Sequence, residues 1–200
     1  MKIPSSRSFG KNYVTLVDCY PKANREGPQD MARDSIERLP DQLEENLRLV
    51  FVGTAASTRS ATEGHYYAHE GNRFWSAIHE AGITDRKYEP SEFRALLKLG
   101  IGFTDLSKSD AGMDHQISAQ SIDVPAFKTK IKKYRPKGIA FTSKKAASLF
   151  YNIPTKAIQL GRQLTEEGLP EIFVLSSPSG AASSHWTPVP WRELGVWLKL

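Results

Sequence analysis

Short apolar runs alternate along this chain with segments whose apolar residues recur every three or four positions. Apolar runs predict strands that are buried on both faces, and they lie at Leu49–Val52, Gly138–Thr142 and Ile172–Leu175. The longer spacing predicts helices at Arg73–Gly82, Pro90–Leu99, Pro125–Tyr134, Ser143–Tyr151 and Pro190–Leu200. Strands that alternate with helices favour a parallel sheet that is covered on both faces. We therefore expect an α/β fold, a three-layer α/β/α sandwich around a mostly parallel four-stranded sheet.

Four further segments carry weaker patterns. Tyr13–Val17 is β-like and predicts a peripheral strand, while Asp34–Leu47 predicts a short helix or two turns that lead into the first strand. Gly100–Leu106 is rich in glycine, and Gln159–Gly168 is expected to form a turn or edge structure.

A long loop follows the first predicted strand. Gly53 breaks the strand, residues 54–60 are mostly small or hydroxyl-bearing, and Tyr66 and Tyr67 close the loop. Asn72 is predicted as the N-cap of the next helix. In open α/β sheets, ligands bind beyond the carboxyl ends of the strands. This loop, with its donors and aromatic rings, is therefore a candidate pocket wall.

A second loop, Ser177–Gly180, has the sequence SPSG and follows the predicted strand Ile172–Leu175. Gly53, Tyr67 and the block NRFW at residues 72–75, taken with SPSG, resemble the two motifs of the uracil-DNA glycosylase superfamily. The resemblance is closest to the mismatch-specific (thymine/uracil mismatch) branch and extends over residues 39–200. It implies a glycosylase-like domain at 39–200, an N-terminal extension at 1–38, and a pocket along which Gly100–Leu106 runs.

The resemblance also implies a function. A protein of this family hydrolyses the N-glycosidic bond of uracil, and of other deaminated or damaged bases, in DNA, after flipping the nucleotide out of the helix. The positions that match its base pocket are Gly53, Thr54, Ala55, Ser57, Tyr67, Asn72 and Ser177. Those expected to contact DNA are Thr58, Ser60, Ser179, Gly180, Ala181, Ala182, Ser183 and His185. Tyr67 matches the ring that stacks on the base, whereas Asn72 either contacts the base or only caps its helix.

The first motif departs from the family at the position that matters most for catalysis. Ala55 stands where the family usually has an asparagine that orients the attacking water, and Ser177 replaces another asparagine. Branches of the family that carry alanine at this position use an acid nearby. The candidates for that role are Glu70 first and His69 second, followed by Glu63, His65 and Asp105. The alternative for Glu70 is a solvated loop carboxylate.

The composition limits the number of domains, the cellular location and the cysteine chemistry that we expect. The 200 residues, 40% of them hydrophobic and 24% charged, suit one domain with a substantial core. No run of 18 apolar residues predicts a membrane span, and residues 1–10 lack the apolar core of a signal peptide, so we expect a cytoplasmic protein, nucleoid-associated in a bacterium. One cysteine, Cys19, excludes a disulfide framework and a four-cysteine iron–sulfur cluster.

The formal net charge of +5 fits a nucleic-acid partner, which the resemblance makes damaged double- or single-stranded DNA. The lysine run Lys128, Lys130, Lys132 and Lys133 either contacts DNA or forms a solvated face. No spacing of metal ligands and no phosphate loop is present, so we expect no metal and no cofactor. We expect a monomer and a monofunctional enzyme. Two other functions stay open: a lesion-binding protein that has lost catalysis, and a small-molecule hydrolase on the same fold.

Overall fold

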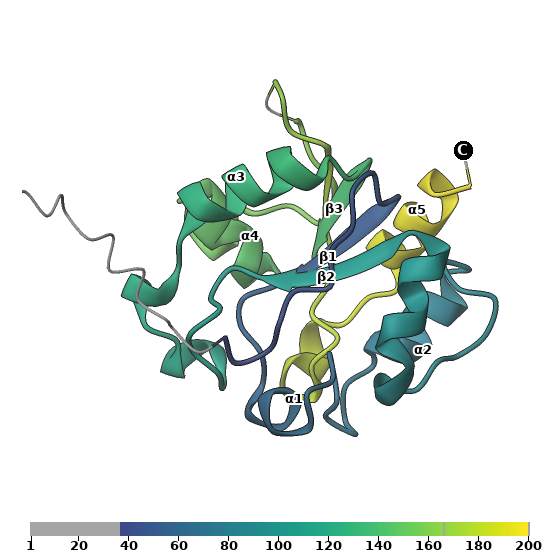
Figure 1. Ribbon diagram of the computed structural model, residues 1–200, viewed down its shortest axis with the longest axis horizontal. Coiled ribbons are helices and arrows are strands. Elements are labelled where there is room, and N and C mark those ends of the chain that lie inside the picture. The colour runs from purple at the N-terminus through teal and green to yellow at the C-terminus, as the bar shows by residue number, and fades with distance from the viewer. Residues whose placement is uncertain (1–36, 166, 200) are drawn as a thin grey trace, which may run out of the picture. The chain divides into compact units, whose positions relative to one another are not determined.

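A five-stranded sheet lies at the centre of the fold (Figure 1). The computed structural model describes residues 37–165 and 167–199, all of which belong to one compact unit, residues 35–200. The strand order is β2-β1-β3-β5-β4, with bounds β1 Leu49–Gly53, β2 Ile101–Asp105, β3 Gly138–Phe141, β4 Gly161–Arg162 and β5 Glu171–Val174. The first four strands in this order are parallel, and β4 pairs with β5 antiparallel. The predicted mostly parallel sheet is confirmed, with one strand more than predicted.

Two segments differ from their predictions: Gly100–Leu106 and the segment before β1. The two segments pair with each other in the structure. Ile101–Asp105 is an edge strand, which its mixed sequence IGFTD concealed. The described part of the segment before β1, residues 37–48, contains no helix but has a turn at residues 45–46, so of the two predicted alternatives the helix is wrong. Gln42 in that segment instead exchanges two backbone hydrogen bonds with Phe103, each of 2.9 Å, and so pairs with the outer edge of β2. The predicted strand Tyr13–Val17 lies outside the described residues.

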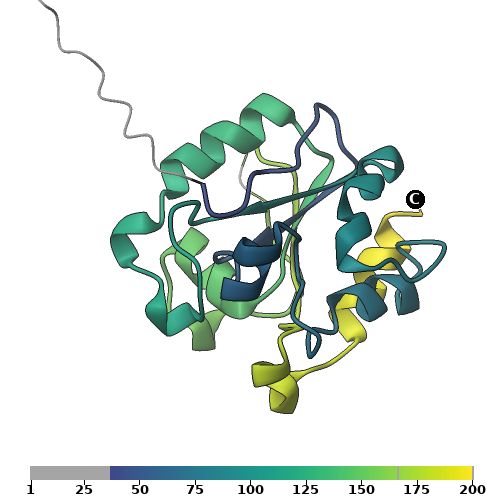
Figure 2. The same ribbon diagram turned by 60° about the horizontal axis from the view of Figure 1, so that its bottom comes forward.

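Helices cover both faces of the sheet. One face carries α2 Phe74–Glu80, the 3-10 helix η1 Pro90–Leu99 and α5 Val189–Trp197, and the other carries α3 Val124–Tyr134 and α4 Lys144–Tyr151 (Figure 2). Along β1, Leu49 and Phe51 pack under the first layer, whereas Val50 and Val52 pack under the second, as the two-residue period of a strand requires. The predicted three-layer architecture is confirmed.

The first face is rich in aromatic side chains. The ring of Phe51 lies 4.9 Å from that of Phe74, edge to face, and 6.0 Å from that of Phe103. Trp191 of α5 completes this cluster and donates from its indole nitrogen to the carbonyl oxygen of Ser176 at 3.1 Å. These contacts fix the ends of β1 and β5 against the helices. The short elements α1 Thr58–Glu63, η2 Asp114–Gln116, η3 Ala119–Ser121, η4 Thr155–Ala157 and η5 Gly180–His185 complete the described chain. Within that chain, no helix is long and apolar enough to cross a membrane.

Candidate active site

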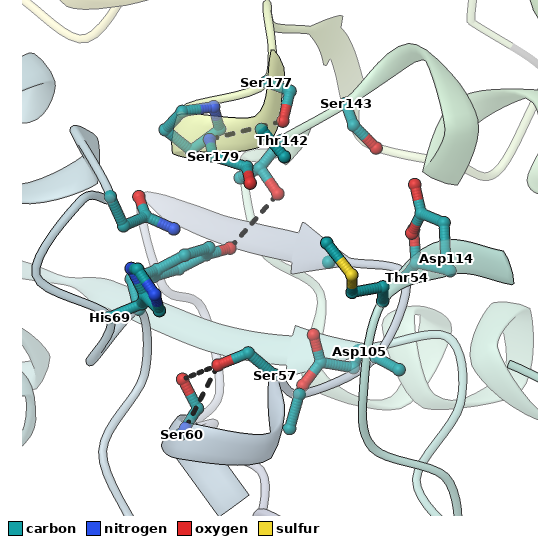
Figure 3. A pocket seen from close by; sticks show the side chains of 18 of the residues that line it. Thr54, Ser57, Ser60, His69, Asp105, Asp114, Thr142, Ser143, Ser177 and Ser179 are labelled. Carbon is teal, nitrogen blue, oxygen red and sulfur yellow. Dashed lines mark hydrogen bonds between the residues drawn. The ribbon is translucent and has the colours of Figure 1, made fainter. Parts of the chain in front are cut away.

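A cavity of about 670 Å³ opens at the carboxyl ends of the parallel strands (Figure 3). Its walls come from the segments that follow β1, β3 and β5, and from the last residue of β2, Asp105. The structure brings together at this cavity all the residues that the sequence predicted for the base pocket: Gly53, Thr54, Ala55, Ser57, Tyr67, Asn72 and Ser177. Hydroxyl-bearing side chains and aromatic rings therefore line the same cavity.

The ring of Tyr67 is held rigidly in the wall. It stacks on Phe74 with a centroid distance of 3.9 Å and an interplanar angle of 9°. Its hydroxyl donates to Oγ1 of Thr142 at 3.2 Å, just after β3. The backbone of Tyr67 has φ of 53°, a conformation that is rare for a bulky residue and that is tolerated where the surroundings fix it. Burial, and secondarily Asp105, raises the pKa of the Tyr67 phenol, so this side chain remains neutral.

Residues 72–75 join the first loop to the second. Asn72 Oδ1 accepts a hydrogen bond from the amide of Phe74 at 2.9 Å, but the N-cap of α2 is Arg73, so the predicted N-cap at Asn72 is wrong by one residue. The amide of Arg73 donates to the carbonyl oxygen of Pro178 at 2.8 Å. Phe74 supports Tyr67 from behind. At Gly180 a Cβ atom would lie 3.0 Å from the carbonyl oxygen of Gly71, so glycine allows the two loops to approach closely.

Asp105 is a buried carboxyl group on the cavity wall. Only 5% of the residue is exposed, and within the described chain its Oδ2 atom has no hydrogen-bond partner. The carboxyl lies beside Gly53, where a Cβ atom would come within 2.2 Å of Oδ1. Burial raises the pKa of Asp105 to about 6; Asp41 adds to the rise, and Lys108 and Lys130 oppose it.

The charges nearest to Asp105 form a group of their own. Asp41 pairs with Lys108 at 2.8 Å and with Lys130, and accepts from Oγ1 of Thr104 at 2.6 Å. Burial raises the pKa of Asp41, but the two lysines and Thr104 outweigh this effect and lower it. The two ammonium groups are therefore already satisfied by Asp41, and Asp105 is left with only their more distant attraction.

A comparison with known protein families agrees with this geometry. The model of the uracil DNA glycosylase superfamily matches residues 40–200. The chain belongs to the uracil DNA glycosylase superfamily. Among solved structures, the fold is similar to the solution NMR structure of a proposed uracil DNA glycosylase from Methanosarcina acetivorans, with a TM-score of 0.58 and 22% sequence identity. That match covers 81% of this chain and 97% of the other, and at this identity it supports the fold alone.

The first catalytic candidates of this superfamily member occupy different places. His69 lines the cavity, and its Nδ1 atom accepts from the amide of Gly71 at 3.0 Å, which supports the loop. Glu70 does not line the cavity: 83% of its side chain is exposed, and its carboxylate pairs with Arg59 at 3.1 Å. Glu63 also pairs with Arg59, at 2.6 Å. Neither Glu63 nor His65 lines the cavity, whereas Asp105 does.

The residues predicted to contact DNA divide in the same way. Ser179, Gly180, Ala181 and Ala182 line the cavity mouth, while Ser183 and His185 are exposed beyond it. Ser60 lines the cavity but is buried, and its hydroxyl accepts from the amide of Ala68 at 3.2 Å. Thr58 is exposed and lies outside the cavity.

The third part of the rim comes from residues 112–115, which were not among the predicted site residues. Gly112, Met113, Asp114 and His115 all line the cavity. The segment is held in place because the amide of Gly112 donates to the carbonyl oxygen of Ala56 at 2.9 Å. Its polar, aperiodic sequence gave no signal, since the pairing with Ala56 is tertiary. No group of three or more potential metal-ligating side chains occurs in the described residues.

Proposed function

We propose that this protein is a monofunctional DNA glycosylase that hydrolyses the N-glycosidic bond of uracil, and of other deaminated or damaged bases, in DNA. The observation that carries the proposal is the cavity itself. The cavity lies at the carboxyl ends of the parallel strands and contains a fixed aromatic ring, Tyr67, among hydroxyl groups and main chain. The chain that forms it is a member of this superfamily. A pocket of 670 Å³ suits one flipped nucleotide, since ligand pockets commonly measure roughly 300–1,000 Å³.

The pocket would bind a base by stacking and by hydrogen bonds. Tyr67 cannot shift easily, because Phe74 supports its ring and Thr142 accepts from its hydroxyl. Stacking on a fixed ring costs little conformational entropy, and base–aromatic stacking contributes about 1–3 kcal/mol per base. The main chain of Thr54 and Ala55 and the hydroxyl of Ser177 are the groups that we assign to the edge of the base.

The rim would bind the DNA around the flipped nucleotide. Residues 179–182 supply small side chains and main-chain amides, which are suited to phosphate contacts. Met113, on the rim, is 56% exposed although it is apolar. Apolar side chains of this kind fill the gap that a flipped base leaves in a duplex. We assign that role to Met113 rather than to His185, which lies outside the cavity and contacts Ser184 at 3.0 Å.

The chemistry of the cavity walls supports monofunctional hydrolysis. A glycosylase that also cleaves the strand needs a pocket amine that forms a Schiff base. Among the described residues no lysine lines the cavity, and Lys144 and Lys145 lie in the first turn of α4 outside it. Water is therefore the nucleophile that we propose.

One observation favours a second function. Ala55 cannot bind the attacking water through its side chain, which is compatible with a protein that binds lesions without cutting them.

One experiment distinguishes the two functions: the purified protein is incubated with a duplex that contains one uracil, and the products are examined with and without alkali. Alkali-dependent breaks at the uracil support the glycosylase, and breaks without alkali contradict the monofunctional assignment. Tight binding without breaks supports the lesion-binding protein. The absence of both binding and breaks supports a small-molecule hydrolase. The same duplex with thymine in place of uracil is the control.

A further inference from the structure

We propose that Asp105, at the carboxyl end of β2, is the group that binds the attacking water and accepts its proton, in place of a side chain at position 55. This inference rests on the proposed function, because it concerns the same cavity. It assigns the catalytic group to the neighbouring strand rather than to the loop that carries Glu70 and His69.

The position of the carboxyl group carries the proposal. Asp105 pairs in register with Gly53, the last residue of β1, so the two residues point to the same face of the sheet. Since Gly53 has no side chain, the carboxyl of Asp105 occupies the space beside it and lines the same cavity as Ala55. Figure 3 shows this side chain at the end of the β2 arrow, on the side of the cavity that carries Ser57 and Ser60, with Thr142 and Ser177 across from it.

The backbone around Asp105 fixes this position. The amide of Leu106 donates to the carbonyl oxygen of Gly53 at 3.0 Å, and that of Ser107 donates to Thr54 at 2.8 Å. These two bonds join the end of β2 to the loop after β1. A catalytic group needs such support, because a displacement of about 1 Å can cost roughly 10²-fold in rate.

The free Oδ2 atom is the second observation. Buried carboxyl oxygens nearly always have hydrogen-bond partners, and leaving one without a partner is costly. Oδ2 of Asp105 has no hydrogen-bond partner among the described residues. The hydroxyl of the preceding residue, Thr104, donates to Asp41 instead. An atom that is shielded from bulk solvent, lines a cavity and lacks a partner is placed to accept from a bound water.

The ionised Asp105 accepts one proton from the water as the water oxygen forms a bond to C1′ of the deoxyribose. The bond between C1′ and N1 of the base breaks, and its electron pair leaves with the base as an anion delocalised over N1 and O2. The sugar keeps a hydroxyl at C1′. The proton that Asp105 has accepted returns to the departing base or to solvent, which restores the carboxylate. The negative carboxylate also stabilises positive charge on the sugar in the transition state.

The groups that face Asp105 set the pH range. Asp41 disfavours its ionisation, whereas Lys108 and Lys130 favour it. Tyr66 and Tyr67 also lie near Asp105: burial, and secondarily this carboxyl, raises the pKa of both phenols. His69, Asp114 and His115 are the other titratable side chains on the cavity wall. With a pKa of about 6, Asp105 is ionised at neutral pH and still close enough to neutrality to accept a proton well.

Single-turnover cleavage of a uracil-containing duplex tests the proposal, with binding measured on a duplex that carries a non-hydrolysable 2′-fluoro-deoxyuridine. Asp105→Asn should lower the rate about 10²-fold or more while changing the Kd less than threefold. Gly53→Ala, which leaves the acid in the chain but pushes its carboxyl aside, should also lower the rate. Glu80→Gln, an exposed acid at the far end of α2, is the matched control and should leave the rate unchanged.

The pH dependence of the single-turnover rate distinguishes a catalytic role of Asp105 from a structural one. For the unmodified protein, the rate should rise about tenfold per pH unit below about pH 6 and level off above it, and Asp105→Asn should abolish this rise. An Asp105→Asn protein that is folded by circular dichroism and retains the full rate overturns the proposal while leaving the proposed function intact. An unmodified protein that makes no abasic sites overturns both.

Discussion

Gly53 and Asp105 are register partners at the ends of two adjacent parallel strands, and the carboxyl of Asp105 occupies the space that a side chain at residue 53 would need. The glycine in the first loop is therefore not only a strand terminator. It provides the room in which an acid from the neighbouring strand reaches the cavity. The two residues are far apart in sequence, and only the pairing of β1 with β2 brings them together.

The buried carboxyl of Asp105 should make the protein less stable at neutral pH. The pKa of Asp105 is about 6 in the folded protein and 3.8 in its ordinary state, so the folded state binds this proton more tightly. This group therefore lowers the free energy of unfolding as pH rises from about 4 to about 6, and the loss persists above pH 6. We expect Asp105→Asn to raise the melting temperature at pH 7.5 by roughly 2–6 °C, with a smaller gain near pH 4.5. Calorimetry at both pH values checks this, and a lower melting temperature at pH 7.5 would show that the carboxylate has a stabilising partner.

Replacing Tyr67 should separate stacking from hydrogen bonding. Tyr67→Ala removes the ring that Phe74 supports, and it should weaken binding to a uracil-containing duplex by about 1–3 kcal/mol, or roughly 5- to 150-fold in Kd. Tyr67→Phe is the matched control, because it keeps the ring and loses only the bond to Thr142. Fluorescence anisotropy with the non-hydrolysable duplex gives both values. Equal affinity for the alanine and phenylalanine variants would mean that the ring only packs in the wall.

How far the sequence predicts this site depends on whether the residues concerned are close in the chain. Residues 72–75 follow Tyr67 within one loop and helix start, so their shared role is visible in the sequence, although the N-cap of α2 is Arg73 and not the predicted Asn72. Asp105 is among the candidate acids in the sequence because the resemblance places residues 100–106 along the pocket, but its position beside Gly53 comes from the pairing of β1 with β2. Met113 joins the cavity through the bond between Ala56 and Gly112, which no local pattern encodes. Glu70 shows the opposite case: it is near Tyr67 in sequence, but its side chain points to Arg59 and solvent.

Ser57 should limit which pyrimidines enter the pocket. It lines the cavity and caps α1, where its hydroxyl accepts from the amide of Ser60 at 3.1 Å. The family resemblance implies that this position lies beside carbon 5 of the pyrimidine, so we expect thymine, with its 5-methyl group, to be cut poorly. Ser57→Gly should improve thymine cleavage relative to uracil, at a small cost in stability, since glycine is a tolerated N-cap.

Ser57→Ala is the control for that experiment, because it removes the hydroxyl while keeping the Cβ atom. Competition between thymine- and uracil-containing duplexes in one reaction gives the ratio of the two rates directly. Equal processing of thymine and uracil by the unmodified protein would contradict a steric role for Ser57.

Met113 should matter only when the target base is paired. Its exposed apolar side chain on the cavity rim is placed to fill the gap left by a flipped base. Met113→Ala should therefore lower single-turnover cleavage of uracil in a fully paired duplex by about 10-fold, and should leave cleavage of single-stranded DNA unchanged. His185→Ala, at an exposed site outside the cavity, should affect neither substrate. A loss on both substrates after Met113→Ala would point to a role in shaping the cavity instead.

Glu70 is the acid that the sequence favours for activating water, and its position in the structure changes the expectation. It is highly exposed, bonds to Arg59 and does not line the cavity, so it cannot reach a water held against the sugar without a rearrangement of the loop. Glu70→Gln should therefore keep the single-turnover rate on a uracil-containing duplex within about twofold, since exposed ion pairs contribute only about 0–1 kcal/mol. His69→Ala should lower the rate more, because His69 accepts from the amide of Gly71 and borders the cavity. If Glu70→Gln instead loses about 10²-fold in rate with unchanged Kd, the loop must close over the bound nucleotide and bring Glu70 inward, and the assignment of the base would pass from Asp105 to Glu70.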